Sequence, residues 1–266
     1  MDYVVVNGVA VEVAGAGPPL VLLHGILQDS RSWRPQLEEL RDDFTIVAWD
    51  APGCGQSADP PETWRFAEYA DCLSAVIAAL ELDHPIVAGL SWGGALAIEF
   101  HRRNPGVASG LVLASAYAGW AGSLPPEVCA ERLESCLAQS EMAPTDVVSA
   151  WLPGLLTTDT SADEVTAMMS DFHPSGFRTM AHAMAEADLR PVLPTIDVPV
   201  LLLYGAADKR APAETVGAAL GAPIRDSRLV VIPGTGHLCN LEQPERFNDA
   251  IRNFKSEELA KRVAVD

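Results

Sequence analysis

Short apolar runs alternate with amphipathic stretches along the first half of the chain, and this alternation restricts the fold more than any other feature. Runs of this kind are typical of strands buried on both faces of a sheet. They are Leu20–Leu23, Thr45–Trp49, Pro85–Ala88 and Leu111–Ala114. The stretches between them have helical spacing, so the sequence predicts an α/β fold with a mostly parallel sheet flanked by helices.

The alternation stops in the middle of the chain and then resumes. From about residue 118 to residue 194 there are helical runs and prolines but no convincing strand, whereas strands resume at Val200–Tyr204 and Leu229–Ile232. We therefore predict a core formed by residues 1–117 and 195–266, and a helical cap formed by residues 118–194. Before the first strand, Asn7-Gly8 lies between β-branched runs and predicts a hairpin.

Helices are predicted in the core where apolar residues recur at helical spacing. They are Trp33–Leu40 with Ser32 in position to cap it, Phe66–Leu80, a small-residue helix that ends at Asn104, Ala213–Leu220 and Pro244–Phe254. Two histidines outside the candidate site, His84 and His101, are expected to be solvated.

The charge balance limits the partners of the chain. Lys and Arg number 18 and Asp and Glu number 36, which gives a net charge of −18. Nucleic acids and anionic membranes repel such a chain, so neither is expected as a partner. We expect a small-molecule substrate, with a homodimer left open. The chain has neither a signal-peptide pattern nor an apolar run long enough to span a membrane, which predicts a cytoplasmic protein.

The sequence predicts neither a metal nor a cofactor. No two of the five cysteines have the C-x-x-C spacing that metal sites use. The segment Gly53-Cys54-Gly55-Gln56-Ser57-Ala58 matches G-x-G-x-x-A, a dinucleotide-binding fingerprint. That fingerprint requires a helix to begin in the loop, and Asp59-Pro60-Pro61 prevents one, so a compact turn is the better interpretation.

One strand-to-helix turn has the residues of a nucleophile site. Gly89-Leu90-Ser91-Trp92-Gly93 matches G-x-S-x-G between a predicted strand and a predicted helix. In this context the serine lies on a sharp turn, and bulk at Gly89 or Gly93 would collide with the neighbouring chain. The helix N-terminus beside Ser91 offers free N–H groups to a developing oxyanion.

A serine nucleophile needs a base and an acid that orients the base. Asp208 directly follows the strand Val200–Tyr204, and His237 lies in a glycine-rich loop after the last predicted strand. The order Ser91, Asp208, His237 fits a catalytic triad at the carboxyl ends of parallel strands. No Asp or Glu lies between Leu113 and Leu124, where some relatives of this architecture place the acid, so Asp208 is the predicted acid.

The loop after the first buried strand, His24-Gly25-Ile26, predicts the second half of an oxyanion hole. The backbone N–H groups of Ile26 and Trp92 are expected to face each other there. His24 itself is expected to hold this loop rather than to act as an acid or base.

These segments together resemble the α/β-hydrolase superfamily. The resemblance rests on Leu22-Leu23-His24-Gly25, the run from Trp49 to Ser57, Gly89-Leu90-Ser91-Trp92-Gly93-Gly94, Tyr204-Gly205-Ala206-Ala207-Asp208 and Gly234-Thr235-Gly236-His237. It implies an α/β-hydrolase fold, a triad of Ser91, Asp208 and His237, and a helical cap over the site. Dehalogenases and epoxide hydrolases of this superfamily have Asp at the nucleophile position, so Ser91 argues against both.

The resemblance implies a serine esterase or lactonase that acts on a small or medium, largely apolar ester. Within the cap, Trp120, Trp151 and Met184 are the candidates for the substrate pocket. The remaining apolar cap residues are expected mainly to pack the cap onto the sheet.

Other activities stay open on the same scaffold. Hydrolysis of a carbon–carbon bond in a diketo acid would need an arginine for the substrate carboxylate, for which Arg178 and Arg190 are candidates. A proline-iminopeptidase-like activity, which Ser91-Trp92-Gly93 suggests, would need cap carboxylates such as Glu186 or Asp188. A cofactor-independent haloperoxidase-like activity uses the same triad, and a ligand receptor on this scaffold would use none of it.

Overall fold

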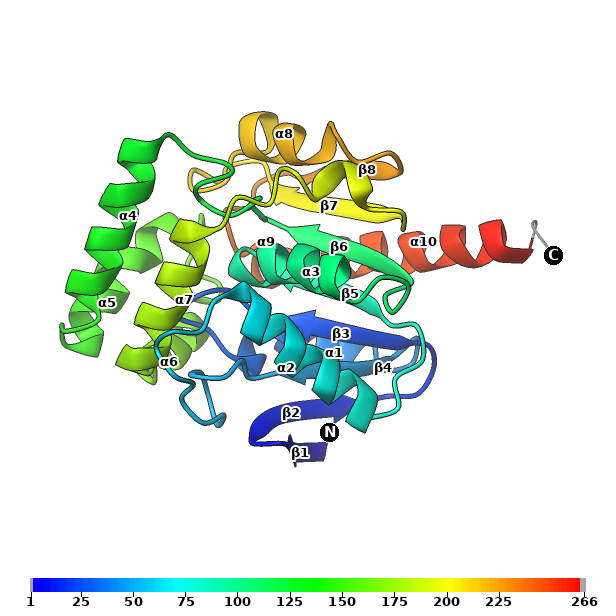
Figure 1. Cartoon of the computed structure of the whole chain (residues 1–266), viewed down its shortest axis with the longest axis horizontal. Coiled ribbons are helices and arrows are strands. Elements are labelled where there is room, and N and C mark those ends of the chain that lie inside the picture. The colour runs from blue at the N-terminus through cyan, green and yellow to red at the C-terminus, as the bar shows by residue number, and fades with distance from the viewer. Residues whose placement is uncertain (1, 264–266) are drawn as a thin grey trace.

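The computed structural model describes the backbone of residues 2–263 and the side chains as far as residue 257. One eight-stranded sheet runs through the core in the order β1-β2-β4-β3-β5-β6-β7-β8 (Figure 1). Its strands are β1 Asp2–Val6, β2 Val9–Ala14, β3 Pro19–Leu23, β4 Thr45–Trp49, β5 Ile86–Leu90, β6 Gly110–Ala114, β7 Val200–Gly205 and β8 Ser227–Ile232. Only the β1–β2 and β2–β4 pairs are antiparallel. The predicted α/β fold and the hairpin at Asn7-Gly8 are therefore confirmed.

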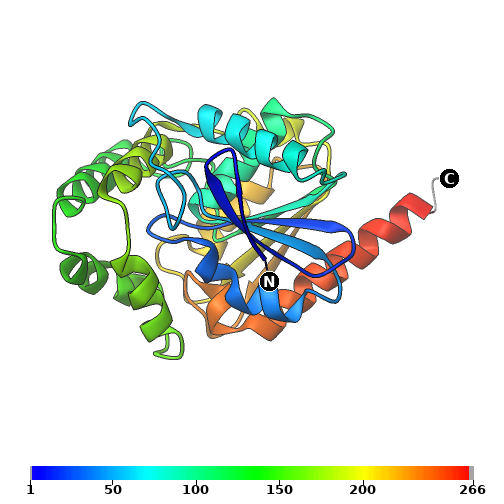
Figure 2. The same ribbon diagram turned by 90° about the horizontal axis from the view of Figure 1, so that it is seen from below.

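Helices cover both faces of this sheet, as Figures 1 and 2 show from two directions. Helices α2 (Phe66–Ala79) and α3 (Trp92–Arg103) pack together on one face, while α1 (Arg34–Glu39) and α10 (Pro244–Val263) lie on the other. The central strands β5 and β6 are buried along their whole length, which explains their uninterrupted apolar sequences.

Between β6 and β7 the chain forms helices that project beyond the carboxyl ends of the parallel strands (Figure 1). They are α4 Pro126–Gln139, α5 Pro144–Trp151, α6 Ala162–Ser170 and α7 Pro174–Glu186. Trp92 joins this layer to the core, because its indole N–H donates to the carbonyl of Met180 at 3.1 Å. We refer to residues 118–194 as the cap, and their status as a separate domain stays a prediction.

Three local expectations need correction. The helix expected from Trp33 begins as a 3-10 turn, Ser30–Trp33, whose cap is Asp29 rather than Ser32, because the Asp29 carboxylate accepts the Arg31 N–H at 2.9 Å. The segment Ala213–Gly217 is wound as a π-type turn and only Ala218–Gly221, α8, continues as α-helix. His101 is buried, with Nε2 3.2 Å from an Asp197 carboxylate oxygen, so it is not solvated.

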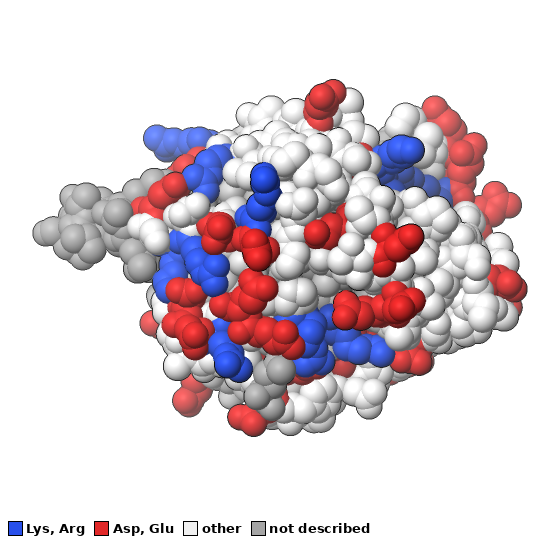
Figure 3. All heavy atoms as spheres, turned by 180° about the vertical axis from the view of Figure 1, so that it is seen from behind, with Lys and Arg blue, Asp and Glu red and all other residues white. Residues whose placement is uncertain are grey.

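The surface is acidic overall but mixed in sign. Figure 3 shows one face, on which Asp and Glu side chains lie among Lys and Arg side chains. No helix within the described residues is long and apolar enough to cross a membrane. In the same part of the chain, no group of three or more His, Cys, Asp or Glu side chains has an arrangement that could hold a metal ion.

Candidate active site

Ser91 lies at the turn between β5 and α3 in a strained backbone conformation. Its φ is 53° and its ψ is −108°. This backbone conformation is unfavourable for any residue other than glycine, and it persists only where the surrounding structure imposes it. The surroundings here are two glycines. A Cβ atom on Gly89 would lie 2.1 Å from the carbonyl oxygen of Gly93, and one on Gly93 would lie 2.2 Å from the carbonyl oxygen of Leu23.

Because of this close packing, we expect Gly93→Ala to destabilise the protein. The new methyl group would meet backbone rather than a flexible side chain, so we expect the free energy of unfolding to fall by about 3 kcal/mol or more. Gly106→Ala is the matched control, because Gly106 has a φ of 78° but open space around it. It should cost about 1 kcal/mol. Urea unfolding of both variants is the measurement, and equal losses would show that the turn is not tightly packed.

His237 and Asp208 are joined by a hydrogen bond. The imidazole Nδ1 lies 2.8 Å from Asp208 Oδ2, and both side chains are buried. The other carboxylate oxygen, Oδ1, accepts the backbone N–H groups of Arg210 at 2.8 Å and Ala211 at 3.0 Å. With Nδ1–H as the donor to the carboxylate, Nε2 carries the lone pair of a general base.

The electrostatics of Asp208 favour its ionised form. Burial alone would raise the pKa of this carboxyl, but the charge of His237 and the hydrogen bonds from His237 and the two backbone N–H groups outweigh burial. The pKa of Asp208 therefore lies below its ordinary value. The carboxylate is accordingly suited to orient the imidazole and to stabilise its protonated form.

The loop that carries His237 is held by the core and by the cap. Ser115 Oγ donates to the His237 carbonyl at 2.9 Å, and the His237 N–H donates to the carbonyl of Leu155 at 2.9 Å. The Gly236 N–H donates to the carboxylate of Glu242. A cap residue, Leu155, thus helps to fix the position of the imidazole.

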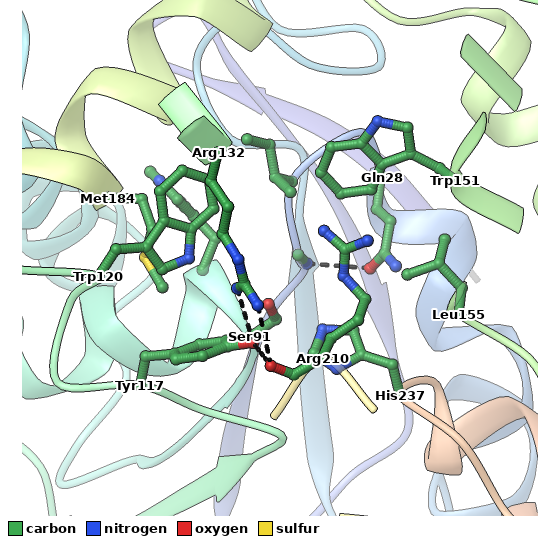
Figure 4. Close-up of a pocket in the computed structure, with 13 residues that line it drawn as sticks. Gln28, Ser91, Tyr117, Trp120, Arg132, Trp151, Leu155, Met184, Arg210 and His237 are labelled. Atoms are coloured by element: carbon green, nitrogen blue, oxygen red, sulfur yellow. Dashed lines mark hydrogen bonds between the residues drawn. The ribbon is translucent and has the colours of Figure 1, made fainter. Parts of the chain in front are cut away.

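Ser91 and His237 line one cavity that is partly open to solvent (Figure 4). The structure also places the three predicted pocket residues Trp120, Trp151 and Met184 at this cavity. Leu155 adds another apolar side chain from the cap. The apolar wall belongs to the cap, whereas Ser91 and His237 belong to the sheet edge below it.

The loop predicted to complete an oxyanion hole lies against the same cavity, which Ile26 and Trp92 both line. Within the described residues the Ile26 N–H has no hydrogen-bond partner. The Trp92 N–H opens helix α3 and has no partner within that helix. Both residues thus lie where an oxyanion hole would be needed, and the oxyanion hole itself stays a prediction.

Two side chains fix the conformation of the Ile26 loop. The ring of His24 bonds through Nδ1 to the Gly25 carbonyl at 2.8 Å and accepts the Ala51 N–H at Nε2 at 2.9 Å. Gln28 Oε1 accepts the Gly25 N–H at 3.0 Å. His24 is thus a structural residue of this loop.

A family model described as the alpha/beta hydrolase family matches residues 20–250. The chain belongs to the alpha/beta hydrolase family.

Individual relatives of this protein align with nearly the whole chain. A thermophilic esterase from Thermogutta terrifontis, solved with malate bound, is 30% identical with a TM-score of 0.89, over 97% of this chain and 99% of that one. The AB hydrolase superfamily protein YisY of Bacillus subtilis is 29% identical over 92% of this chain and 94% of its own length. The 3-oxoadipate enol-lactonase 2 of Acinetobacter baylyi is 26% identical over 94% of each.

Four polar residues that line the cavity holding Ser91 are not predicted from the sequence, namely Gln28, Tyr117, Arg132 and Arg210. Arg210 had a usable signal, because it follows β7 by the same rule that located Asp208. Arg132 had none, because it lies on α4 in a segment without strands to place it.

Proposed function

We propose that the protein is a serine hydrolase that cleaves a carboxylic ester or lactone through an acyl-enzyme, without a cofactor. The observation that carries this proposal is the arrangement of Ser91 and His237. Ser91 lies on a strained turn at the start of a helix, in the cavity lined by a histidine whose Nδ1 is bonded to a buried carboxylate.

The proposed mechanism uses this chain's residues in two steps. Ser91 Oγ attacks the ester carbonyl while His237 Nε2 takes its proton, and the N–H groups of Ile26 and Trp92 stabilise the oxyanion. The C–O bond of the ester then breaks, and His237 returns the proton to the leaving alkoxide. Water next attacks the acyl group on Ser91, with His237 as base. The bond between Ser91 Oγ and the acyl carbon breaks, His237 returns the proton to Oγ, and the carboxylic acid leaves. Asp208 keeps the imidazole in the required tautomer.

The names of two relatives support ester and lactone cleavage. One is an esterase and another is an enol-lactonase, and both match almost the full length of this chain.

The residues expected for other activities are engaged elsewhere. Arg178 pairs with Glu62 and Glu141, and Arg190 pairs with Asp188. Neither arginine lines the cavity that holds Ser91, so these two candidates are not placed to bind a substrate carboxylate there. Glu186, the first candidate for binding a substrate amine, pairs with Arg65. Among the described residues, no Asp or Glu lines the cavity that holds Ser91, which disfavours an aminopeptidase.

A substrate panel tests the proposed function. The purified protein should hydrolyse an aryl ester or a lactone and leave a prolyl arylamide uncleaved. Turnover of the arylamide alone would favour the aminopeptidase. If none of the substrates is turned over while a ligand binds at the cavity, the protein is a receptor on a hydrolase scaffold.

The cap is proposed to set the choice of acyl or alcohol group. Met184→Ala removes an apolar side chain from the cavity wall, and each lost pocket contact should change discrimination by about 1–3 kcal/mol. We therefore expect the ranking of kcat/KM for a short, a long and an aromatic ester to change. Met142→Ala is the control, because Met142 is an exposed cap methionine outside the cavity lining. Equal scaling of all three esters by Met184→Ala would contradict this role.

A further inference from the structure

Two arginines line the cavity that holds Ser91 without a carboxylate to balance them. Arg132 comes from α4 in the cap, and Arg210 comes from the loop after β7 (Figure 4). Within the described residues neither has an ion pair, whereas other part-buried arginines, such as Arg65 and Arg178, pair with carboxylates. Two arginines without a paired carboxylate are unexpected in a chain that has 36 acidic and only 18 basic residues.

Arg210 is fixed relative to the proposed catalytic residues. Its backbone N–H donates to Asp208 Oδ1 at 2.8 Å, and its backbone carbonyl accepts bonds from the Tyr117 hydroxyl and from Arg132 Nη2. Its guanidinium lies 4.1 Å from the centre of the Trp151 ring and makes no hydrogen bond within the described residues. The cation is thus held in place while its N–H groups remain available.

Arg132 is held in a similar way on the other side of the cavity. Its guanidinium donates to the Tyr117 hydroxyl at 3.2 Å and lies 5.7 Å from the centre of the Trp120 ring. These contacts position the group but do not neutralise it. Because a guanidinium has five N–H donors in a planar fork, Arg132 retains donors for a ligand.

The adjoining space has the same charge character. Two further cavities share Arg132 and Arg210 with the one that holds Ser91, and Lys209 lines both of them. No Asp or Glu among the described residues lines any of the three. A partly buried cation without a counter-ion is costly, and burial lowers the pKa of Arg210 accordingly. An anionic ligand would relieve that cost.

A purely structural role explains these arginines only in part. Stacking on Trp120 and Trp151 and tethering of the Arg210 backbone account for their positions. They do not account for two cations in one cavity that no described Asp or Glu lines, since neutral side chains could fill the same space without that electrostatic cost.

We propose that Arg132 and Arg210 bind a carboxylate carried by the substrate, so that the preferred ester or lactone is one with a free carboxylate distal to the bond that is cleaved. Guanidinium groups recognise carboxylates through paired N–H donors, which gives both charge and orientation. The inference rests on the proposed function and narrows its substrate class to anionic esters and lactones, in place of the largely apolar ester expected from the sequence.

The first test compares two aryl esters of matched length, the monoaryl ester of glutaric acid and the aryl ester of pentanoic acid. We expect wild-type kcat/KM to be about tenfold or more higher for the glutarate ester, the size of a charge-assisted hydrogen bond lost or gained. Arg132→Gln and Arg210→Gln should each lower this ratio by about tenfold. Arg178→Gln, whose arginine is paired outside this cavity, should leave the ratio unchanged.

A second measurement separates this inference from the proposed function. Calorimetry with glutarate on the Ser91→Ala protein reports carboxylate binding without any turnover. We expect binding that weakens about tenfold in Arg132→Gln or Arg210→Gln backgrounds. Arg210→Lys keeps the charge and should retain part of the binding, which distinguishes lost recognition from a damaged fold. Thermal unfolding of each variant checks the fold directly.

The outcomes are distinct. Turnover of both esters with no preference for the anionic one, together with no glutarate binding, would overturn the inference and leave the proposed function standing. Arginine-dependent glutarate binding without hydrolysis of any ester would support the anion site and overturn the proposed function. A preference for the anionic ester that survives both glutamine substitutions would assign the recognition to other residues and overturn the inference.

Discussion

Ser91→Ala is expected to lower kcat/KM on every ester or lactone substrate by about a millionfold, as loss of a nucleophile does in a triad that acts as a unit. The hydroxyl removed is the atom that would form the acyl bond, and within the described residues the cavity offers no second serine to replace it. Initial rates on the preferred substrate, with thermal unfolding to confirm the fold, are the measurement.

The control for this variant is Ser149→Ala. Ser149 is an exposed serine of α5 whose hydroxyl bonds to the Thr145 carbonyl at 2.8 Å, so its loss should leave activity unchanged. If the folded Ser91→Ala protein retained more than about one hundredth of wild-type activity, another group would have to be the nucleophile.

Asp208→Asn is expected to have the second-largest effect, a loss of about 10⁴-fold in kcat. The amide that replaces the carboxylate can hydrogen-bond to His237 with the wrong ring nitrogen protonated, and it no longer stabilises the imidazolium. Because the amide has nearly the same shape, the backbone bonds to Arg210 and Ala211 should change little. Steady-state kinetics with the preferred ester is the measurement.

Asp197→Asn provides a matched control. Asp197 also lies beside a histidine, His101, at 3.2 Å, but this pair is outside the candidate site. Its substitution should leave kcat unchanged. Near-normal activity of Asp208→Asn would show that a different carboxylate orients His237 or that the histidine needs none.

The strands and the Ser91 turn could be predicted from local sequence because their physical causes are local. A strand buried on both faces must be apolar throughout, as Ile86–Leu90 is, and a turn this tight must have glycines at both flanks. Asp208 and His237 could be located because parallel strands end at one edge of the sheet. The structure then brings His237 and Asp208 into contact across 28 intervening positions of chain.

The cavity wall could be predicted only in part because it depends on how the cap docks on the core. Trp151 was a candidate because of its apolar bulk, but its contact with Arg210 joins a cap helix to the loop after β7. Nothing in the local sequence of α4 indicates that Arg132 faces Tyr117 and not solvent. Such contacts arise from tertiary packing between segments that are distant in sequence.

The predictions of one helix and of a solvated His101 were wrong for a related reason. The local sequence of Ala213–Leu220 has helical spacing, yet Gly217 packs against the ring of Tyr204, and the chain there winds as a π-type turn. His101 lies beside Arg102 and Arg103, which suggested a solvated helix end, but its own face of α3 turns toward the core.

Covalent labelling tests the central claim, that Ser91 is an activated nucleophile, most directly. The protein would be treated with an aryl phosphonate, and the adduct would be located by mass spectrometry of its peptides. We expect one adduct per chain, on Ser91, that forms in parallel with loss of activity and forms much more slowly in Asp208→Asn. An adduct on any other residue that accompanies the loss of activity, or ester turnover that survives complete labelling of Ser91, would contradict it.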